Sequence, residues 1–186
     1  METYTVKDLM VPLEEYVTVP LGTTLLGAML ALEKAQENYD QGKYHHRAVL
    51  VLDRENKVVG RISQLRVLQA METREENTEL YAQLKMYQFS DAYVDKLREN
   101  DRIKCKVFAE ETLKEATEKP VEDFMQKPTP DEYVDESEKL DLAMHKMVAG
   151  AHQSLLVTRD KDIVGILRMV DIFTASFHAM KSLGVA

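Results

Sequence analysis

The most informative segment of the chain is Val157-Thr-Arg-Asp-Lys-Asp-Ile-Val-Gly-Ile-Leu-Arg-Met-Val-Asp-Ile172, because nearly the same pattern occurs earlier as Val51-Leu-Asp-Arg-Glu-Asn-Lys-Val-Val-Gly-Arg-Ile-Ser-Gln-Leu-Arg-Val67. Each segment has an apolar run, a polar turn, a second apolar run that opens at Val-Gly, and the start of a helix. The turns lie at Asp53 to Lys57 and at Arg159 to Asp162, between β-branched and Leu residues. This pattern predicts two adjacent antiparallel strands that lead into a helix, once in each copy.

The duplication extends upstream of the strands. Val6-Lys-Asp-Leu-Met10 recurs as Val121-Glu-Asp-Phe-Met125, and a proline follows each segment within a few residues, at Pro12 and Pro128. Two copies of one structural unit are therefore expected.

The two copies differ in length. The interval from Met10 to Gly60 is about ten residues longer than the corresponding interval from Met125 to Gly165. We place the additional residues at Gln36 to Tyr44, a polar, turn-prone extension after a helix. The two glycines are expected where the backbone closely approaches a neighbouring segment or a ligand.

Alternating β-rich and helix-periodic segments predict an α/β (α+β) fold. The helical pattern is clearest in the second copy, where apolar residues recur at i, i+3, i+4, i+7 and i+8 over Leu140 to Val148, before Gly150. Thr23 or Thr24 is expected to cap a helix that starts at Leu25, and Ser63 to cap another. The remaining expected elements are a short helix before Pro12, strands at 16–19, 47–52, 58–62, 154–157 and 163–167, and helices at 64–71 and 169–183.

The segment 72–119 separates the copies, so we divide the chain into repeat 1 (1–71), an insert (72–119) and repeat 2 (120–186). Apolar residues at helical intervals predict two or three helices in the insert. One interpretation is a helical cover that packs on the repeats. The other is a dimerisation or partner-binding element, and the tyrosines of the insert favour an interface.

Composition limits the possible function classes. The formal net charge of −8 argues against binding to nucleic acid or to an anionic membrane. No apolar run reaches the roughly 18–20 residues that span a bilayer, and no signal peptide is visible, so a cytoplasmic protein is expected. The single cysteine, Cys105, has no intramolecular disulfide partner and is expected to be a spare thiol.

The duplicated unit resembles a tandem pair of cystathionine β-synthase (CBS) domains, called a Bateman module, over roughly 5–70 and 120–180. The resemblance implies two β-α-β-β-α repeats packed with pseudo-two-fold symmetry. It also implies an adenine nucleotide or adenosyl ligand (AMP, ADP, ATP or S-adenosylmethionine) in the cleft between the repeats, an unknown protein effector and no required cofactor. Such pairs commonly form homodimers through the helices of each repeat, for which this chain offers Met144, Met147, Met169 and Phe173.

In this family a Gly-h-x-Ser/Thr-x-x-Asp motif holds the ligand, where h is apolar. The hydroxyl and the free N–H groups of a helix N-terminus meet phosphate, and the carboxylate accepts hydrogen bonds from the ribose. The first site, Gly60 to Arg66, keeps Ser63 but has arginine, a donor only, in place of the carboxylate. The second site, Gly165 to Asp171, keeps the carboxylate and has Arg168 in place of the hydroxyl, so we expect it to bind.

An ordinary helix start explains the second site equally well, with a solvated Arg168 and an acidic first turn favoured by the helix dipole. The predicted ligand-binding residues are Asp171, Arg168, Ile166, Gly165, Val134, His152 and Leu155 in the second site, and Ser63, Arg66, Ile62, Val17, Thr18 and Arg47 in the first.

No nucleophile elbow, Walker A loop, Rossmann glycine motif or zinc-binding motif occurs in the sequence, so neither an enzyme nor a metal site is expected. Two function hypotheses remain. The first is a regulatory module that binds an adenine nucleotide and signals to a partner, and the second is a scaffold or dimerisation protein that has kept the fold and lost the ligand.

Overall fold

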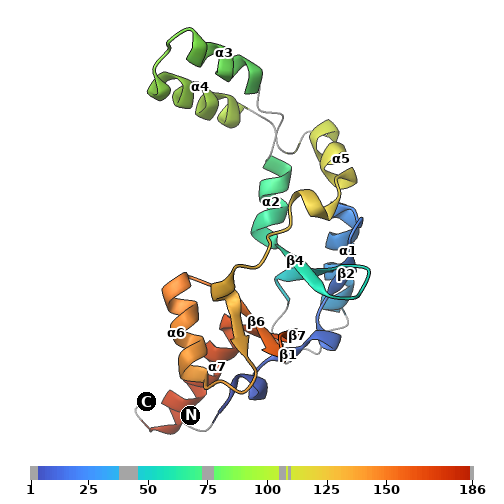
Figure 1. Cartoon of the computed structure of the whole chain (residues 1–186), viewed down its shortest axis with the longest axis vertical. Coiled ribbons are helices and arrows are strands. Elements are labelled where there is room, and N and C mark those ends of the chain that lie inside the picture. Colours follow the sequence, from blue (N-terminus) through green and yellow to red (C-terminus); the bar gives the residue numbers. More distant parts are fainter. Residues whose placement is uncertain (1–3, 38–45, 73–77, 105–107, 109, 185–186) are drawn as a thin grey trace.

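The computed structural model describes residues 4–37, 46–72, 78–104, 108 and 110–184. Two small sheets and their helices form the body of the molecule, and part of the insert extends from it along the long axis (Figure 1). Most of the predicted extension at Gln36 to Tyr44, and Cys105, lie outside the described residues.

The first sheet has the order β2-β3-β4, with β2 (Thr18–Pro20) parallel to β3 (Ala48–Leu52) and β3 antiparallel to β4 (Val58–Ser63). Helices α1 (Leu25–Glu37) and α2 (Gln64–Glu72) belong to the same repeat. Both predicted caps of this repeat are present, because the Thr24 hydroxyl accepts a hydrogen bond from the Gly27 N–H at 3.1 Å and the Ser63 hydroxyl accepts one from the Arg66 N–H at 3.3 Å.

The second sheet has the order β1-β7-β6-β5. Strands β6 (Ser154–Arg159) and β7 (Asp162–Arg168) form the predicted antiparallel pair, β5 (Tyr133–Asp135) runs parallel to β6, and β1 (Val11–Pro12) runs antiparallel to β7. Helix α6 (Leu140–Gly150) ends at Ala151, which adopts the left-handed conformation with φ 51°. Helix α7 (Met169–Ser182) follows β7 directly, and the predicted α/β fold class is confirmed.

The duplicated Val-x-Asp-x-Met segments are exchanged between the repeats. The 3-10 turn Val6–Asp8, found where a short helix was expected, packs on the second sheet, and the Val6 N–H donates to the Glu138 carbonyl at 2.9 Å. The turn Val121–Asp123 packs on the first sheet, and the Val121 N–H donates to the Thr23 carbonyl at 2.9 Å. The repeats are therefore interlocked, although the division at 1–71, 72–119 and 120–186 stays a prediction.

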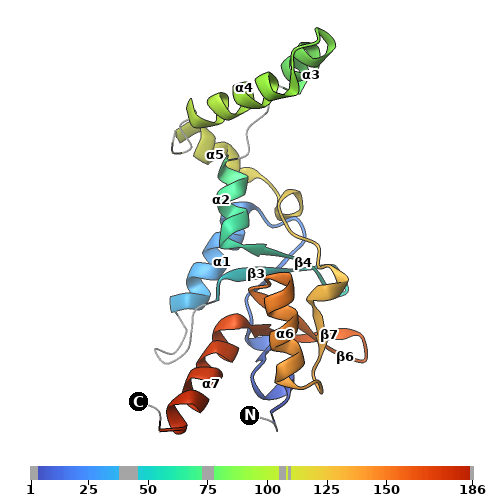
Figure 2. The same ribbon diagram turned by 90° about the vertical axis from the view of Figure 1, so that its left-hand side faces the viewer.

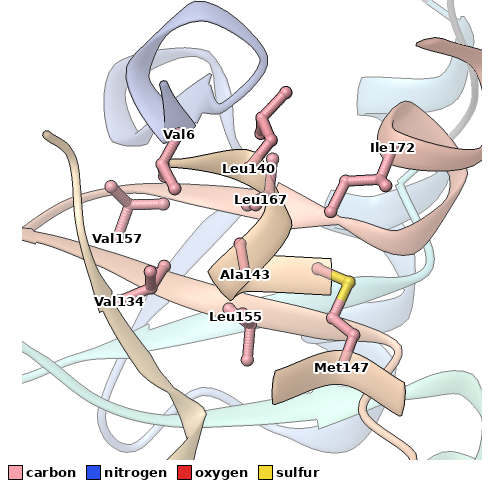
Figure 3. Close-up of a cluster of buried hydrophobic side chains, with 9 residues drawn as sticks. All are labelled: Val6, Val134, Leu140, Ala143, Met147, Leu155, Val157, Leu167 and Ile172. Carbon is pink, nitrogen blue, oxygen red and sulfur yellow. The ribbon is translucent and has the colours of Figure 1, made fainter. Parts of the chain in front are cut away.

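Each sheet buries one face against its own helices and the other face against the second sheet, since side chains alternate along a strand. The cores under the helices contain Val6, Val134, Leu140, Ala143, Met147, Leu155, Val157, Leu167 and Ile172 in repeat 2 (Figure 3), and Val17, Val19, Ala28, Val49, Val51, Ile62 and Val121 in repeat 1. The inter-sheet surface consists of Val11, Tyr16, Leu50, Leu156 and Ile166 with partly buried neighbours.

Gly60 and Gly165 lie where the chain that follows each exchanged segment pairs with a strand of the other repeat, Pro12 with Gly165 and Gln126 with Arg61, next to Gly60. A Cβ atom at Gly165 would lie 2.6 Å from the Val11 carbonyl oxygen, and one at Gly60 would lie 2.5 Å from the Met125 sulfur. The predicted close backbone approach is therefore made to a neighbouring segment of the same chain.

The insert contains helices α3 (Thr78–Met86), α4 (Asp91–Lys104) and α5 (Glu110–Glu118). Helix α5 covers the first repeat, because Ala116 packs with Leu25 and Ala70. Helices α3 and α4 instead form a hairpin that stands away from the sheets in both views (Figures 1 and 2). Tyr81 and Val94 are buried in this hairpin, and the Arg98 guanidinium lies 4.9 Å from the Tyr81 ring centroid. The helical-cover interpretation thus applies to α5 but does not describe the hairpin.

Candidate functional site

The strongest feature of the second site is a two-pronged ion pair where β7 meets α7. Arg168 is the last residue of β7, and its Nε and Nη2 donate to the two carboxylate oxygens of Asp171 at 2.6 and 2.7 Å. The side chains are only 10% and 15% exposed. The sequence places these residues three positions apart at the start of a helix, a spacing that allows such a contact.

Ser154 lies directly across from Arg168 in the β6–β7 pair, so their side chains lie on the same face of the sheet. This is the face toward repeat 1, because the Ser154 hydroxyl accepts a hydrogen bond from Arg61 Nη1 at 3.2 Å. The Met169 N–H donates to the Gln153 carbonyl at 2.9 Å and fixes the corner between β7 and α7. Arg168 and Ser154 therefore lie on the inter-sheet face of the second sheet.

A buried ion pair joins the repeats beside Ser154. Arg61, on β4, donates through Nη2 to Glu132 Oε1, and Glu132 is almost fully buried. The Thr129 N–H donates to the other oxygen of Glu132 at 2.9 Å. Arg61 is also held through its backbone, since it exchanges two N–H···O bonds with Gln126 at 3.0 and 2.8 Å. Charges buried in this way are tolerated because each has an opposite partner and further hydrogen bonds.

His152 extends this polar cluster toward the protein surface. Its Nε2 is hydrogen-bonded to Asp131 Oδ2 at 2.9 Å, and its Nδ1 lies 3.8 Å from Glu132. The pKa of Asp131 is lowered, chiefly because the Thr129 side chain donates to its carboxylate, with smaller contributions from its own backbone and from His152. The predicted residue His152 thus lies beside the second site in contact with two carboxylates.

The first site has a different chemistry. Arg66 donates from Nη1 to Gln69 Oε1 at 3.1 Å along the exposed side of α2, so it turns toward its own helix. At the place that corresponds to His152, His46 is buried and packs edge-on against Tyr16, with ring centroids 4.3 Å apart. Arg47 is exposed and Thr18 is half-buried. The described residues place no carboxylate at the motif position of this site.

Four predicted residues lie on the opposite face of their strands from the inter-sheet surface. Val134 and Leu155 belong to the core under α6 and α7, and Val17 and Ile62 belong to the core of repeat 1. Of the predicted apolar residues, the structure brings only Ile166 to the inter-sheet surface, and Gly165 faces the exchanged segment. Whether any of these residues contacts a ligand stays a prediction.

The same alternation exposes to the inter-sheet surface several residues that the sequence reasoning missed. Arg61 stands between Gly60 and the buried Ile62, so a strand at this place had to direct Arg61 away from the core. Its partner Glu132 is 71 positions away in the sequence, and no local pattern indicates the pairing. Ser154 and Asp131 were also missed, because their partners, Arg61 and His152, are likewise distant in the sequence.

Within the described part of the chain, no group of three or more His, Cys, Asp or Glu residues is arranged to hold a metal ion. Among the same residues, no helix has both the length and the apolar character needed to cross a membrane.

The CBS domain model matches the chain at residues 6–73 and 121–178. No curated protein matches it. Among solved structures, a CBS domain-containing protein of unknown function from Bacillus anthracis is similar, with 20% identity, 95% of each chain covered and a TM-score of 0.62.

Two further similar structures contain adenosyl compounds. CBSX2 in complex with AMP has 19% identity and a TM-score of 0.58, with 95% of this chain and 98% of that chain covered. The CBS domain pair of protein MJ0100, in complex with 5′-methylthioadenosine and S-adenosyl-L-methionine, has 16% identity, the same coverage and the same TM-score. At these identities the similarity shows the shared fold.

Proposed function

Because the chain belongs to the CBS domain family as a tandem pair, we propose that it is a regulatory module that binds an adenine nucleotide or adenosyl ligand between its repeats and signals occupancy to a protein partner. CBS domain pairs are generally regulatory modules, and we propose no catalytic role. A cytoplasmic location and the absence of nucleic acid binding stay predictions.

The observation that carries this proposal is the position of Asp171. Its carboxylate lies in the first turn of α7, at the motif position that resembles the family's ribose-binding acid, and on the side of the sheet that faces repeat 1. Similar structures that hold AMP or S-adenosyl-L-methionine support the class of ligand. Among the described residues of the first site, where Arg66 is turned along its own helix, the motif position offers no equivalent acceptor.

The test is ligand-induced stabilisation combined with a matched pair of variants. A ligand present at 100 times its Kd stabilises the native state by about 2.7 kcal/mol, so AMP, ADP, ATP and S-adenosylmethionine are compared by thermal unfolding. Asp171→Ala removes a charge-assisted acceptor for the ribose and should weaken binding roughly ten- to hundredfold, or about 1.5–3 kcal/mol. Arg66→Ala, at the corresponding position of the first site, should leave the affinity unchanged in calorimetric titration.

A different outcome would favour the second hypothesis, a CBS-fold scaffold without a ligand. The two motif arginines support that hypothesis. Arg66 is hydrogen-bonded to Gln69, and Arg168 to Asp171, so both side chains have partners within the protein itself. The scaffold hypothesis predicts that none of the four compounds changes the unfolding temperature, either of the parent protein or of Asp171→Ala.

We also propose that the protein is a homodimer. Along α7 the residues Met169, Phe173, Phe177 and Met180 are exposed at spacings that place them on one side of the helix. Met144, on α6, is exposed as well, whereas Met147, predicted for the same surface, is buried in the repeat 2 core. An exposed apolar stripe of this kind is typical of an interface between identical subunits.

A further inference from the structure

We propose that the α3–α4 hairpin is a self-association surface, through which hairpins from two copies of this chain pack face to face as a four-helix bundle. The surface is separate from the exposed stripe on α7, so it joins one homodimer to the next. The inference depends on neither the nucleotide site nor its ligand.

The two helices of the hairpin run antiparallel and bury one residue each. Lys85, near the end of α3, forms an ion pair at 2.9 Å with Asp91, the first residue of α4. Tyr81 and Val94 are buried, whereas the other described side chains of the two helices are half-buried or exposed. Tyr81 and Val94 therefore mark the sides on which α3 and α4 face each other.

The residues beside this contact form an apolar face. In α3, Leu80 lies one position before the buried residue and Leu84 lies three positions after it. In α4, Tyr93 and Leu97 have the same offsets. Successive helical residues turn by about 100°, so both offsets lead to one side of each helix, and in an antiparallel pair to one face of the hairpin. We call Leu80, Leu84, Tyr93 and Leu97 the apolar face.

The apolar face is open, and the opposite face is charged. Phe89, between the helices, stacks on Tyr93 with ring centroids 5.3 Å apart and extends the face toward the tip. Leu80, Phe89 and Tyr93 are 43%, 46% and 47% exposed, because the hairpin stands away from the sheets (Figures 1 and 2). Lys85 and Asp91 lie four positions after and three positions before the buried residues, which turns their ion pair to the opposite face.

Size gives the hairpin a reason to associate. Units below about 40 residues rarely bury enough apolar surface to be stable alone, and many of them oligomerise. The hairpin spans only residues 78–104, and none of its described residues belongs to the cores of the two repeats. Two hairpins that join their apolar faces form a helix bundle, in which the apolar stripes of facing helices share one core.

Charge indicates that the occupant of the apolar face is a second copy. Residues 78–104 contain five Asp or Glu and five Lys or Arg residues, so the hairpin is formally neutral while the chain carries −8. A neutral surface does not attract a strongly charged partner, whereas two neutral hairpins meet without repulsion. The hairpins also hold the acidic bodies apart, and exposed charges are screened beyond about 8 Å at physiological ionic strength.

The area of the apolar face predicts a weak contact. Helix α4 has 14 residues and is therefore about 21 Å long, and two helices side by side are about 20 Å wide. Two such faces bury about 800 Å² in total, which is below the roughly 1,200–2,000 Å² of stable interfaces. Homodimers should therefore predominate at low concentration and associate further only when the concentration is raised.

The first experiment measures the mass of the full-length protein by sedimentation equilibrium at about 5 to about 500 µM, a range that covers weak contacts. The mass of the parent protein should rise above twice 21.3 kDa. Tyr93→Glu should stop at twice 21.3 kDa, because a charge on the apolar face is costly to bury. Met86→Glu is the matched control. Met86 is 83% exposed but lies five positions after Tyr81, away from the apolar face, so this variant should associate as the parent protein does.

A tryptophan probe locates the contact without a charge and serves if Tyr93→Glu does not fold. The chain contains no tryptophan, so Tyr93→Trp introduces a single reporter and keeps an aromatic ring beside Phe89. Its emission should shift to shorter wavelength as the concentration rises and the ring loses contact with water. Met86→Trp, which places the reporter off the apolar face, should show no shift.

Phe173→Glu separates the hairpin contact from the α7 stripe, since this variant should be monomeric at about 5 µM and approach a dimer at about 500 µM. Three outcomes would overturn the proposal. A parent mass that never exceeds twice 21.3 kDa would leave the apolar face to a different protein. Equal losses of association in Tyr93→Glu and Met86→Glu would show that the contact does not use this face. A rising mass without a shift in the emission of Tyr93→Trp would place the contact elsewhere.

Discussion

Removal of one partner of the Arg61–Glu132 pair is expected to destabilise the interlocked repeats strongly, because the other partner is left buried without its counter-charge. Glu132 has a side chain that is 2% exposed, and Arg61 is 13% exposed, so the pair is shielded from water. Arg61→Met keeps the aliphatic stem and removes the charge, which leaves the Glu132 carboxylate with the Thr129 N–H as its remaining close donor apart from His152 at 3.8 Å. Breaking a buried pair in this way costs about 3–5 kcal/mol.

That cost is a large share of the 5–15 kcal/mol by which proteins of this kind are stable. The double variant Arg61→Met, Glu132→Leu should be less destabilised than Arg61→Met alone, because it removes the uncompensated charge as well as the pair. Urea unfolding at neutral pH measures the free energy of unfolding of the four proteins in this double-mutant cycle, which are the parent protein, Arg61→Met, Glu132→Leu and the double variant. The comparison requires equal m-values for all four.

Arg159→Met provides the matched control. Arg159 forms an ion pair with Glu136 but is 51% exposed, and an exposed pair contributes at most about 1 kcal/mol. If Arg61→Met were no more destabilising than Arg159→Met, the pair between the repeats would not be an effective buried contact, and the reasoning from burial would be refuted.

Two further predictions concern the dimer and the exchanged segments. Phe173→Glu places a charge on the exposed stripe of α7, and sedimentation should show a species near 21.3 kDa in place of one near twice that mass. Gly165→Ala should be more destabilising than Gly60→Ala, because the new methyl group meets the backbone oxygen of Val11 in the first case and the flexible side chain of Met125 in the second. We expect about 1–3 kcal/mol for Gly165→Ala, measured by urea unfolding.

Each of these predictions has a direct control. Met86→Glu changes an exposed apolar residue of the α3–α4 hairpin, and it should leave the dimer intact. If Met86→Glu gave monomers and Phe173→Glu did not, the insert would be the dimerisation element. Equal costs for the two glycine variants would show that the backbone near Val11 moves as readily as a methionine side chain.

Local patterns predicted the elements of the fold well. The duplicated strand pairs, the caps at Thr24 and Ser63 and the helices of the insert all depend on residues close together in the sequence, and the structure confirms them. The exchange of the Val6 and Val121 segments was not predicted. Two nearly identical segments carry no local information on which of two similar sheets each will cover.

The candidate site was only partly accessible from sequence. The motif predicted that Arg168 contacts phosphate and that Asp171 contacts ribose. In the structure the two side chains pair with each other, which their spacing of three residues allows. Val134 and Leu155 were assigned to the site from their strands, but a shift of one residue along a strand moves a side chain to the other face. Only the observed register distinguishes the two faces.

The position of α7 suggests how binding would reach a partner. Asp171 lies in its first turn, and Phe173, which is 67% exposed, belongs to the stripe that we propose for the dimer. A ligand that binds at Asp171 would therefore act on the helix that also carries the proposed interface. If such a ligand changes the affinity between subunits, dimerisation must change the affinity for the ligand by the same factor, because the two equilibria are linked. A comparison of AMP titrations below and above the dimer dissociation constant would measure that factor.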